Sequence, residues 1–230
     1  MVTTHPCLPQ ASSLPLRSNE DERGGAVRGA IGVGFGIAAV PLLGFLSGLT
    51  RGIASIGLQM GATFTAGALS NLATGEKFDS YLNIGIGTFT IPIRNGKLSK
   101  NPFDHLNNIY SLYYHSRVII DGLNGNANLG FDLNSFRMTA SPINGKTGFV
   151  ADQVGWDYGF HKGGVIFLES GADMSTILHE GIHATQAGVS GGNLDWYLSY
   201  SMSSPFYTYE DSPWEKWAFK FSDIMILNKR

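Results

Sequence analysis

Cysteine is nearly absent from this chain, and its absence limits how the fold can be held together. Cys7 is the only cysteine among 230 residues. An internal disulfide framework needs pairs of cysteines, and a thiolate-based structural zinc site needs several. Both are excluded, so a metal site in this chain has to be built from histidine and carboxylate side chains.

Charge is also scarce. Charged residues make up 15% of the sequence, against about a quarter in an ordinary globular protein, and the net charge is −2. Proteins that bind nucleic acid usually carry a strongly basic face or stripe. We therefore expect no nucleic-acid partner. The length suits one good-sized domain, alone or with an appended segment.

The N-terminal region has no basic segment that leads straight into an apolar core, as a normal secretory signal would. Residues 1–25 hold three prolines and the charged run Asn19–Arg23. This composition predicts a disordered segment or a linker.

Residues 26–78 are rich in glycine and apolar side chains. The stretch 29–50 has no charged residue and is long enough to span a bilayer. Glycines recur at a spacing of four, as in Gly44 and Gly48, which lets helices approach closely in lipid or in water. The many glycines and Pro41 make the stretch only modestly apolar. Two interpretations stay open: a buried helical hairpin, and a membrane-active segment that contacts lipid through residues 29–50.

Residues 79–230 show the mixed patterns of an α+β domain. Residues 82–93 alternate apolar and polar side chains and predict a strand, which Asn95-Gly96 ends in a tight turn. Asn101 opens a helical pattern in which Leu106, Ile109, Leu112 and Tyr113 fall on one apolar stripe. Further short strands or ordered loops are expected at residues 127–131, 136–139, 148–151 and 165–169.

The motif that carries chemistry is His179-Glu180-Gly-Ile-His183. Asp173 or Ser175 can cap a helix here, and Gly188 is a natural end. On a helix, side chains four residues apart lie on one face, so both imidazoles can bind one metal ion. Glu180 then lies close enough to take a proton from a metal-bound water.

A catalytic zinc site normally has three protein ligands, so a third must follow residue 183. The metzincin spacing is excluded, because Gln186 and Val189 stand where glycine and histidine would be required. Three candidates remain: Asp195, Glu210 and Glu215. Asp195 follows Gly192 as in the aspzincin pattern, although Asn193 and Leu198 depart from that pattern.

Glu215 follows Pro213, which suits the first turn of a helix, and shares a helix face with Ala218. A small residue there would let this helix press against the one that bears the histidines. The stretch from about 164 to 220 thereby resembles gluzincin-type metallopeptidases, which have an apolar strand, His-Glu-x-x-His and a later Glu-x-x-Ala.

That resemblance implies a zincin-like domain in which the strand at 165–169 is the edge strand that lines the substrate cleft. It also implies that His179, His183 and Glu215 bind Zn²⁺. Glu180 would be the catalytic base of a zinc metalloendopeptidase, a hydrolase acting on protein or peptide. A ligand-bearing C-terminal helix completes this fold.

The oxyanion formed in peptide hydrolysis needs a hydrogen-bond donor besides the metal. The side chains that could supply it are Tyr197, Tyr200, Tyr207, Tyr209 and His161, and spacing alone does not choose among them. Gln186, nearly one turn beyond His183, is a further residue that could face the site.

Residues 29–100 have a different resemblance. A glycine-rich apolar stretch that ends in Tyr81-Leu-Asn-Ile-Gly-Ile-Gly87 is similar to the linker before the C-terminal toxin domain of bacterial Rhs/YD-repeat polymorphic toxins. This implies a secreted toxin or effector, delivered into a target cell by a carrier without its own signal peptide and countered by an immunity protein. Membrane association would follow if residues 29–50 enter lipid.

Two other functions stay open from the sequence. One is a membrane-active protein that works through residues 29–75 and in which the helix at 179 is structural. The other is a zinc-stabilised binding module whose metal is closed off by a fourth protein ligand.

Overall fold

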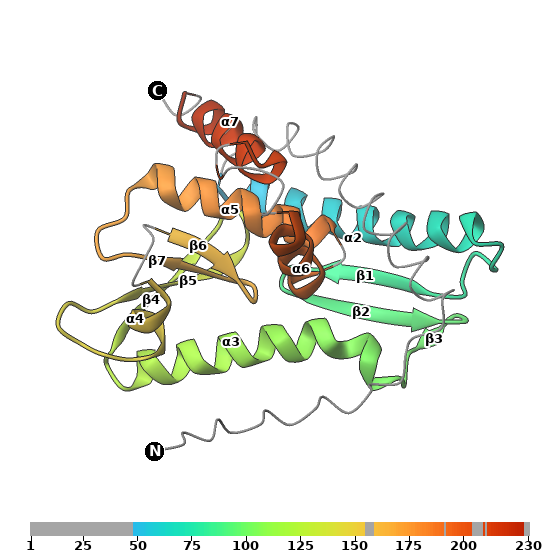
Figure 1. Ribbon diagram of the computed structural model, residues 1–230, viewed down its shortest axis with the longest axis horizontal. Helices are drawn as coiled ribbons and strands as arrows, with labels where there is room; N and C mark the ends of the chain where they lie inside the picture. The colour runs from blue at the N-terminus through green and yellow to red at the C-terminus, as the bar shows by residue number, and fades with distance from the viewer. Residues whose placement is uncertain (1–47, 155–158, 191, 204–208, 210, 228–230) are drawn as a thin grey trace, which may run out of the picture.

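The structure is a computed structural model that describes residues 48–154, 159–190, 192–203, 209 and 211–227. These residues form a mixed α+β protein with two small sheets (Figure 1). The helical elements are α2 (Gly48–Ala73), η1 (Pro102–His105), α3 (Leu106–Leu123), α4 (Phe149–Val154), α5 (Met174–Val189), α6 (Asn193–Ser203) and α7 (Pro213–Leu227). The strands are β1 (Leu82–Ile86), β2 (Phe89–Arg94), β3 (Lys97–Leu98), β4 (Ala127–Asp132), β5 (Arg137–Pro142), β6 (Gly159–Lys162) and β7 (Val165–Leu168).

The first sheet is an antiparallel meander in the order β1-β2-β3. The single strand predicted for residues 82–93 is wrong, because the chain reverses at Gly87 and pairs Leu82 with Ile93. Gly87 has a φ of +60° and is the first residue of a two-residue hairpin turn, a position that favours glycine. The predicted turn at Asn95-Gly96 is confirmed, since both residues have positive φ and join β2 to β3.

The second sheet has the order β4-β5-β7-β6. β7 is parallel to β5 and antiparallel to β6, so it lies inside the sheet and all four of its residues are buried. The stretch 148–151, expected as a strand or an ordered loop, instead falls largely in helix α4.

The elements around the second sheet form layers, as Figure 1 shows: α7 lies over α5, α5 lies on the sheet, and α3 lies on the opposite side. Val118, Val150 and Phe167 belong to the core between the sheet and helices α3 and α4. A second core, which includes Leu178 and Phe221, joins α5 to α7. The layers hold α5 between the sheet and α7.

Helix α2 packs against α5 and β1, and polar side chains take part in its contact with α5. The fully buried hydroxyl of Ser55 shares a hydrogen bond of 3.3 Å with that of Thr185. Gly188 gives α2 room, since a Cβ there would lie 2.3 Å from Cδ of the Gln59 side chain. Helix α2, which precedes the division expected at residue 78, thus packs directly on α5 of the segment that follows.

The hypothesis that residues 29–50 contact lipid concerns mostly residues that the structure does not describe. Residues 1–25, expected to be disordered or a linker, and 29–47 of the apolar stretch lie outside the described ranges. Within those ranges, no helix combines the length and apolar character that a bilayer span requires.

Arg137 is a buried cation that ties several elements together. Its side chain is fully buried and donates to the carbonyl oxygens of Gly87 at 2.8 Å and Ala184 at 3.2 Å. Burial lowers its pKa to about 10, although Asp132 nearby opposes this shift. These bonds hold the β1–β2 turn against α5, the helix that carries the His-Glu-x-x-His motif.

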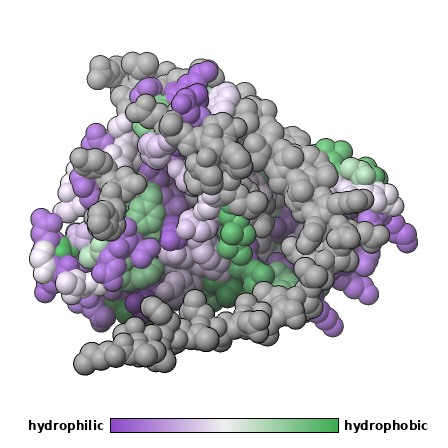
Figure 2. Space-filling view, viewed as in Figure 1, coloured by the Kyte–Doolittle hydropathy of each residue, from purple (hydrophilic) through white to green (hydrophobic). Residues whose placement is uncertain are grey.

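The apolar stripe of α3 faces outward. Leu106, Ile109 and Leu112 are exposed, whereas Asn107 and Ser111 are buried. In Figure 2, green apolar atoms reach the surface toward the lower edge of the molecule, where α3 runs in Figure 1. The buried polar residues have partners in the fold, for example the hydrogen bond of Ser111 with Asn193.

Candidate metal centre

The centre is built on α5, and a cap sets where that helix begins. The side chain of Asp173 accepts a hydrogen bond of 2.8 Å from the backbone N–H of Thr176. The choice left open between Asp173 and Ser175 is thus decided for Asp173. With the start of the helix set, His179 and His183 fall on one face a turn apart.

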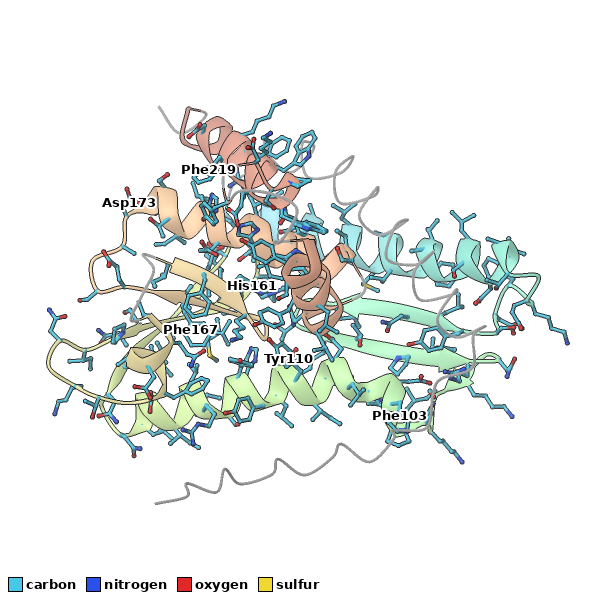
Figure 3. The ribbon with its side chains drawn as sticks, viewed as in Figure 1. Phe103, Tyr110, His161, Phe167, Asp173 and Phe219 are labelled. Atoms are coloured by element: carbon cyan, nitrogen blue, oxygen red, sulfur yellow. The ribbon has the colours of Figure 1, made fainter. Side chains whose placement is uncertain are left out.

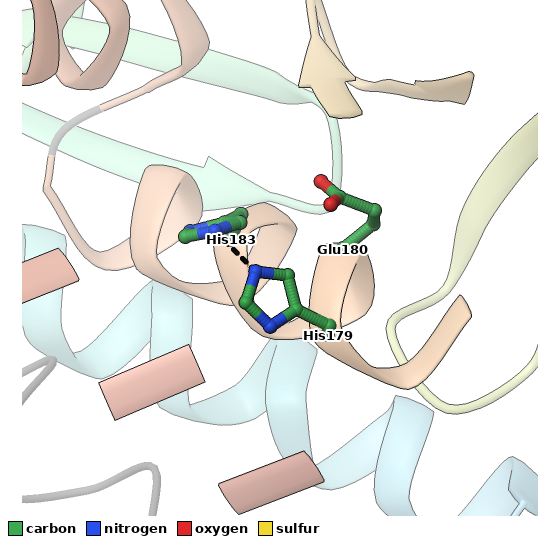
Figure 4. A group of neighbouring side chains, drawn as sticks. All are labelled: His179, Glu180 and His183. Atoms are coloured by element: carbon green, nitrogen blue, oxygen red, sulfur yellow. Dashed lines mark hydrogen bonds between the residues drawn. The ribbon is translucent and has the colours of Figure 1, made fainter. Parts of the chain in front are cut away.

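His179, Glu180 and His183 form a buried cluster that could hold a metal ion (Figure 4). Each residue offers one possible ligand atom, a ring nitrogen or a carboxylate oxygen, and these three atoms all lie within 4.8 Å of one another. The exposed fractions of the three residues are 7%, 4% and 3%, respectively. The Nε2 atoms of the two histidines are 3.1 Å apart.

Glu215 reaches the same point from α7, although it is far from the histidines in the sequence. Helix α7 begins at Pro213, as predicted, and presses Ala218 and Phe221 against α5. Glu215 Oε2 lies 3.0 Å from His179 Nε2 and 3.3 Å from His183 Nε2. Glu215 is 2% exposed, so the contact is shielded from bulk water.

Gln186 determines which nitrogen of His183 is free to bind. Its amide oxygen accepts a hydrogen bond of 2.8 Å from His183 Nδ1, and its amide nitrogen donates to the Trp214 carbonyl at 3.1 Å. An amide oxygen can only accept, so Nδ1 carries a proton, and Nε2 is the nitrogen that offers a lone pair to a metal ion when the ring is neutral. This lone pair points to the group formed with His179 and Glu215.

The second oxygen of Glu215 is held by Tyr200, whose hydroxyl donates to Oε1 at 2.7 Å. Burial raises the pKa of Tyr200, and the bond with Glu215 adds to the rise. For Glu215 itself burial opposes ionisation, but hydrogen bonds from His179 and His183 outweigh it and hold the pKa well below its usual range. Glu215 is therefore a carboxylate at neutral pH.

His183 lies in a negative environment. Burial alone would lower its pKa, yet the hydrogen bond with Glu215 and the nearby charge of Glu180 raise it above the ordinary value. The same negative neighbours that favour the protonated ring would also favour a bound cation. The site has the charge and the lone pairs to attract a positive ion.

A cleft of about 320 Å³ opens beside the cluster. Its lining includes Glu180, His183 and Glu215, the strand β6, and the rings of Trp196 and Tyr200. The remaining lining residues are Gln153, Tyr197 and Tyr209. The cluster that could hold a metal ion therefore faces a space that a ligand can enter.

The prediction that residues 165–169 line this cleft as the edge strand is wrong. β7 is covered on both sides by β5 and β6, and the strand that lines the cleft is β6. Gly159 lets β6 lie close on α5, because a Cβ there would meet Thr176 Cγ2 at 2.7 Å and Glu180 Cγ at 3.3 Å.

The other candidates for the third ligand are not placed by the structure. Asp195 lies on α6, but its side chain is outside what the structure describes, and Glu210 is outside the described residues altogether, as is Tyr207. Tyr197, Tyr200, Tyr209 and His161 all line the cleft.

Two aromatic rings next to the histidines were not singled out from the sequence. The Trp196 ring centre lies 5.5 Å from that of His183, and the Phe219 ring centre lies 4.4 Å from that of His179. The only signal for them is the density of aromatic residues after position 195, which is equally typical of a core.

Comparison of the chain with protein-family models, with curated proteins and with solved structures found no match. The function is therefore argued from the site alone.

Proposed function

We propose that this chain is a zinc-dependent peptidase in which His179, His183 and Glu215 hold the metal and Glu180 is the catalytic base. The observation that carries the proposal is the contact of Glu215 with both histidines. It joins residues 36 and 32 positions apart, so it is not a consequence of helix geometry.

The distances fit zinc. Two ligands of a tetrahedral zinc ion with bonds of about 2.0–2.1 Å lie about 3.3 Å apart. The three distances among His179 Nε2, His183 Nε2 and Glu215 Oε2 are 3.0, 3.1 and 3.3 Å. Two imidazoles and one carboxylate are also a ligand set that catalytic zinc sites use, with a further position left for water or substrate.

When bound, zinc would polarise the substrate carbonyl and make water more acidic. Glu180 lines the cleft and is 4% exposed. From there its carboxylate can take a proton from water and pass that proton to the leaving amine. Gln186 and Tyr200 keep His183 and Glu215 oriented.

The strand β6 favours a peptide as the substrate. Among the described residues it pairs only with β7, so its other edge has backbone groups available to an extended chain. It lies on α5 and lines the cleft beside Glu180. An edge strand beside the helix that bears the histidines, and a later helix that brings Glu215, support our proposal of a zincin-like fold of the gluzincin type.

The decisive experiment compares Glu180→Gln with the wild type. We expect zinc content to stay at about one per chain and hydrolysis of labelled, denatured casein to fall by about 100- to 10,000-fold, the contribution of a general base. Glu76→Gln is the matched control, because the same chemical change is made at an exposed residue outside the cleft.

Glu180→Gln, a second variant and a chelator separate the alternatives. Loss of zinc in Glu180→Gln would identify Glu180 as a ligand and favour a closed, non-catalytic binding module. Liposome leakage that persists after chelation and in His179→Ala would favour a membrane-active protein acting through residues 29–75. Delivery as a toxin by a carrier, with an immunity partner, rests on the resemblance of residues 29–100 and stays a prediction.

A further inference from the structure

Two buried rings in the cleft have hydrogen-bonding atoms that no described residue satisfies. Both ring nitrogens of His161 and the indole Nε1 of Trp196 lack a partner among the described residues and are closed to bulk water. Each of the two residues is 4% exposed. Buried polar atoms are nearly always paired in folded proteins, so two such rings in one cleft are a candidate position for binding an acceptor.

The two rings are neighbours, and they lie beside the metal centre. The ring centres of His161 and Trp196 are 5.6 Å apart, and the Trp196 ring is 5.5 Å from that of His183. Both residues line the cleft together with Glu180. Figure 3 shows His161 between the β6–β7 hairpin and α6, the helix that carries Trp196.

The chemistry of the pair calls for an acceptor. Burial lowers the pKa of His161 well below its usual value, and the charges of Arg137, His183 and His115 lower it further. The imidazole is therefore neutral and carries one N–H, while an indole nitrogen can only donate. Two N–H donors near one another, with no acceptor for either among the described residues, suit an oxygen that arrives with a ligand.

We propose that His161 and Trp196 form a subsite that binds an acceptor oxygen of the substrate beside the metal centre. The proposal rests on the proposed peptidase function. The oxygen has two chemical sources: the carbonyl of the bond that is cleaved, or a carboxylate at the end of the substrate. Phe160 and Lys162 alternate with His161 along β6 and lie on the other face, where Phe160 stacks on Phe167.

Two probes distinguish the sources. The first is the dipeptide Leu-Trp with a phosphoryl group on its amino nitrogen, and the second is the same compound as its C-terminal amide. Binding to the full, zinc-loaded chain is measured by calorimetry for the wild type, His161→Phe and Trp196→Phe. Both variants keep an aromatic ring and remove the N–H.

We expect His161→Phe to bind the probes about 10- to 100-fold more weakly, as for a lost hydrogen bond to a charged oxygen. If both probes lose affinity equally, the oxygen bound by the subsite belongs to the phosphoryl group, which stands for the carbonyl of the bond that is cleaved. If only the probe with the free C-terminal carboxylate loses affinity, the oxygen belongs to that carboxylate. Affinities equal to the wild type for both probes would overturn the subsite.

His161→Gln keeps a side-chain N–H and should recover part of the affinity; a glutamine variant as weak as the phenylalanine variant would contradict a donor role. Zinc content and melting temperature are recorded for every variant, and loss of zinc in His161→Phe would count against the proposal.

A test that needs no substitution is ¹⁵N-detected NMR of the wild type. Probe binding should move the signal of the His161 ring N–H downfield, and an unmoved signal would refute the contact.

The outcome is separable from that of the peptidase proposal. Casein hydrolysis that depends on Glu180, together with unchanged probe affinity in His161→Phe, would leave the peptidase standing and remove the subsite. A wild-type protein that binds zinc but neither probe would also remove the subsite, and the casein assay would then decide the peptidase by itself.

Discussion

Replacing Gln186 with leucine tests whether the orientation of His183 is set by its neighbour. Gln186 is 4% exposed, and both of its polar atoms are used, by His183 Nδ1 and by the Trp214 carbonyl. Leucine has a similar size but can neither accept nor donate. The substitution therefore removes two hydrogen bonds with little change in volume.

The expected loss is in zinc affinity. Removing a residue that orients a metal-binding histidine typically costs about 10- to 100-fold in metal affinity, or about 1.4–2.7 kcal/mol. The reason is that His183 can move its proton to Nε2 once Nδ1 has no acceptor. The buried N–H of His183 also loses its partner, which should destabilise the metal-free protein by about 1–3 kcal/mol.

A competition titration with a chromophoric zinc chelator at neutral pH measures the affinity, and urea unfolding of the metal-free protein measures the stability. Gln186→Glu is the matched control, because a carboxylate still accepts from His183 Nδ1 but cannot donate to the Trp214 carbonyl. We expect this variant to bind zinc much more tightly than Gln186→Leu.

Wild-type zinc affinity in a folded Gln186→Leu protein would refute the argument about the proton on His183. Equal losses in the leucine and glutamate variants would instead assign the effect to the bond with the Trp214 carbonyl. That bond positions the start of α7, and with it Glu215.

Three further predictions concern the packing and the charge around the site. Gly188→Ala places a Cβ 2.3 Å from Cδ of Gln59 and should lower the free energy of unfolding in urea by about 1–3 kcal/mol. Gly61→Ala on α2 is the control: its added Cβ has no atom within 4 Å, so it should raise the free energy of unfolding by up to about 1 kcal/mol. Asp173→Ala removes the cap of α5 and should cost about 1 kcal/mol in the same assay, and an unchanged value would contradict the capping role. The pKa of His161 is lowered in the fold, so below pH 6.5 the unfolded chain binds a proton that the folded chain does not. The free energy of unfolding should therefore decrease as the pH is lowered, by at most about 1.4 kcal/mol per pH unit for this group. His161→Phe should lose this part of the slope in urea unfolding between pH 7 and 5, and identical slopes in the two proteins would refute it.

Part of the fold could be predicted because it depends on neighbours in the sequence. The cap at Asp173, the turn at Asn95 and the helix start at Pro213 all follow from residue types within a few positions. The same local rules did not place the hairpin turn at Gly87. Alternation continues through both of its strands, so the periodicity alone resembles one longer strand.

Periodicity also cannot tell which face of an element is covered. The apolar stripe of α3 was visible in the sequence, but it is the opposite face, with Asn107 and Ser111, that is buried. The choice of edge strand fails for a related reason. The apolar run of β7 is typical of a strand buried on both faces, and it lies inside the sheet while β6 takes the edge.

The sequence by itself determined that His179, Glu180 and His183 share one turn of helix, because the rise and twist of an α-helix are the same wherever it occurs. It could name Glu215 among three candidates for the third ligand but could not choose by geometry. Only the packing of α7 on α5, through Ala218 and the apolar side chains around it, brings that carboxylate to both imidazoles. Contacts between residues more than thirty positions apart depend on how whole helices pack, and no local spacing contains that information.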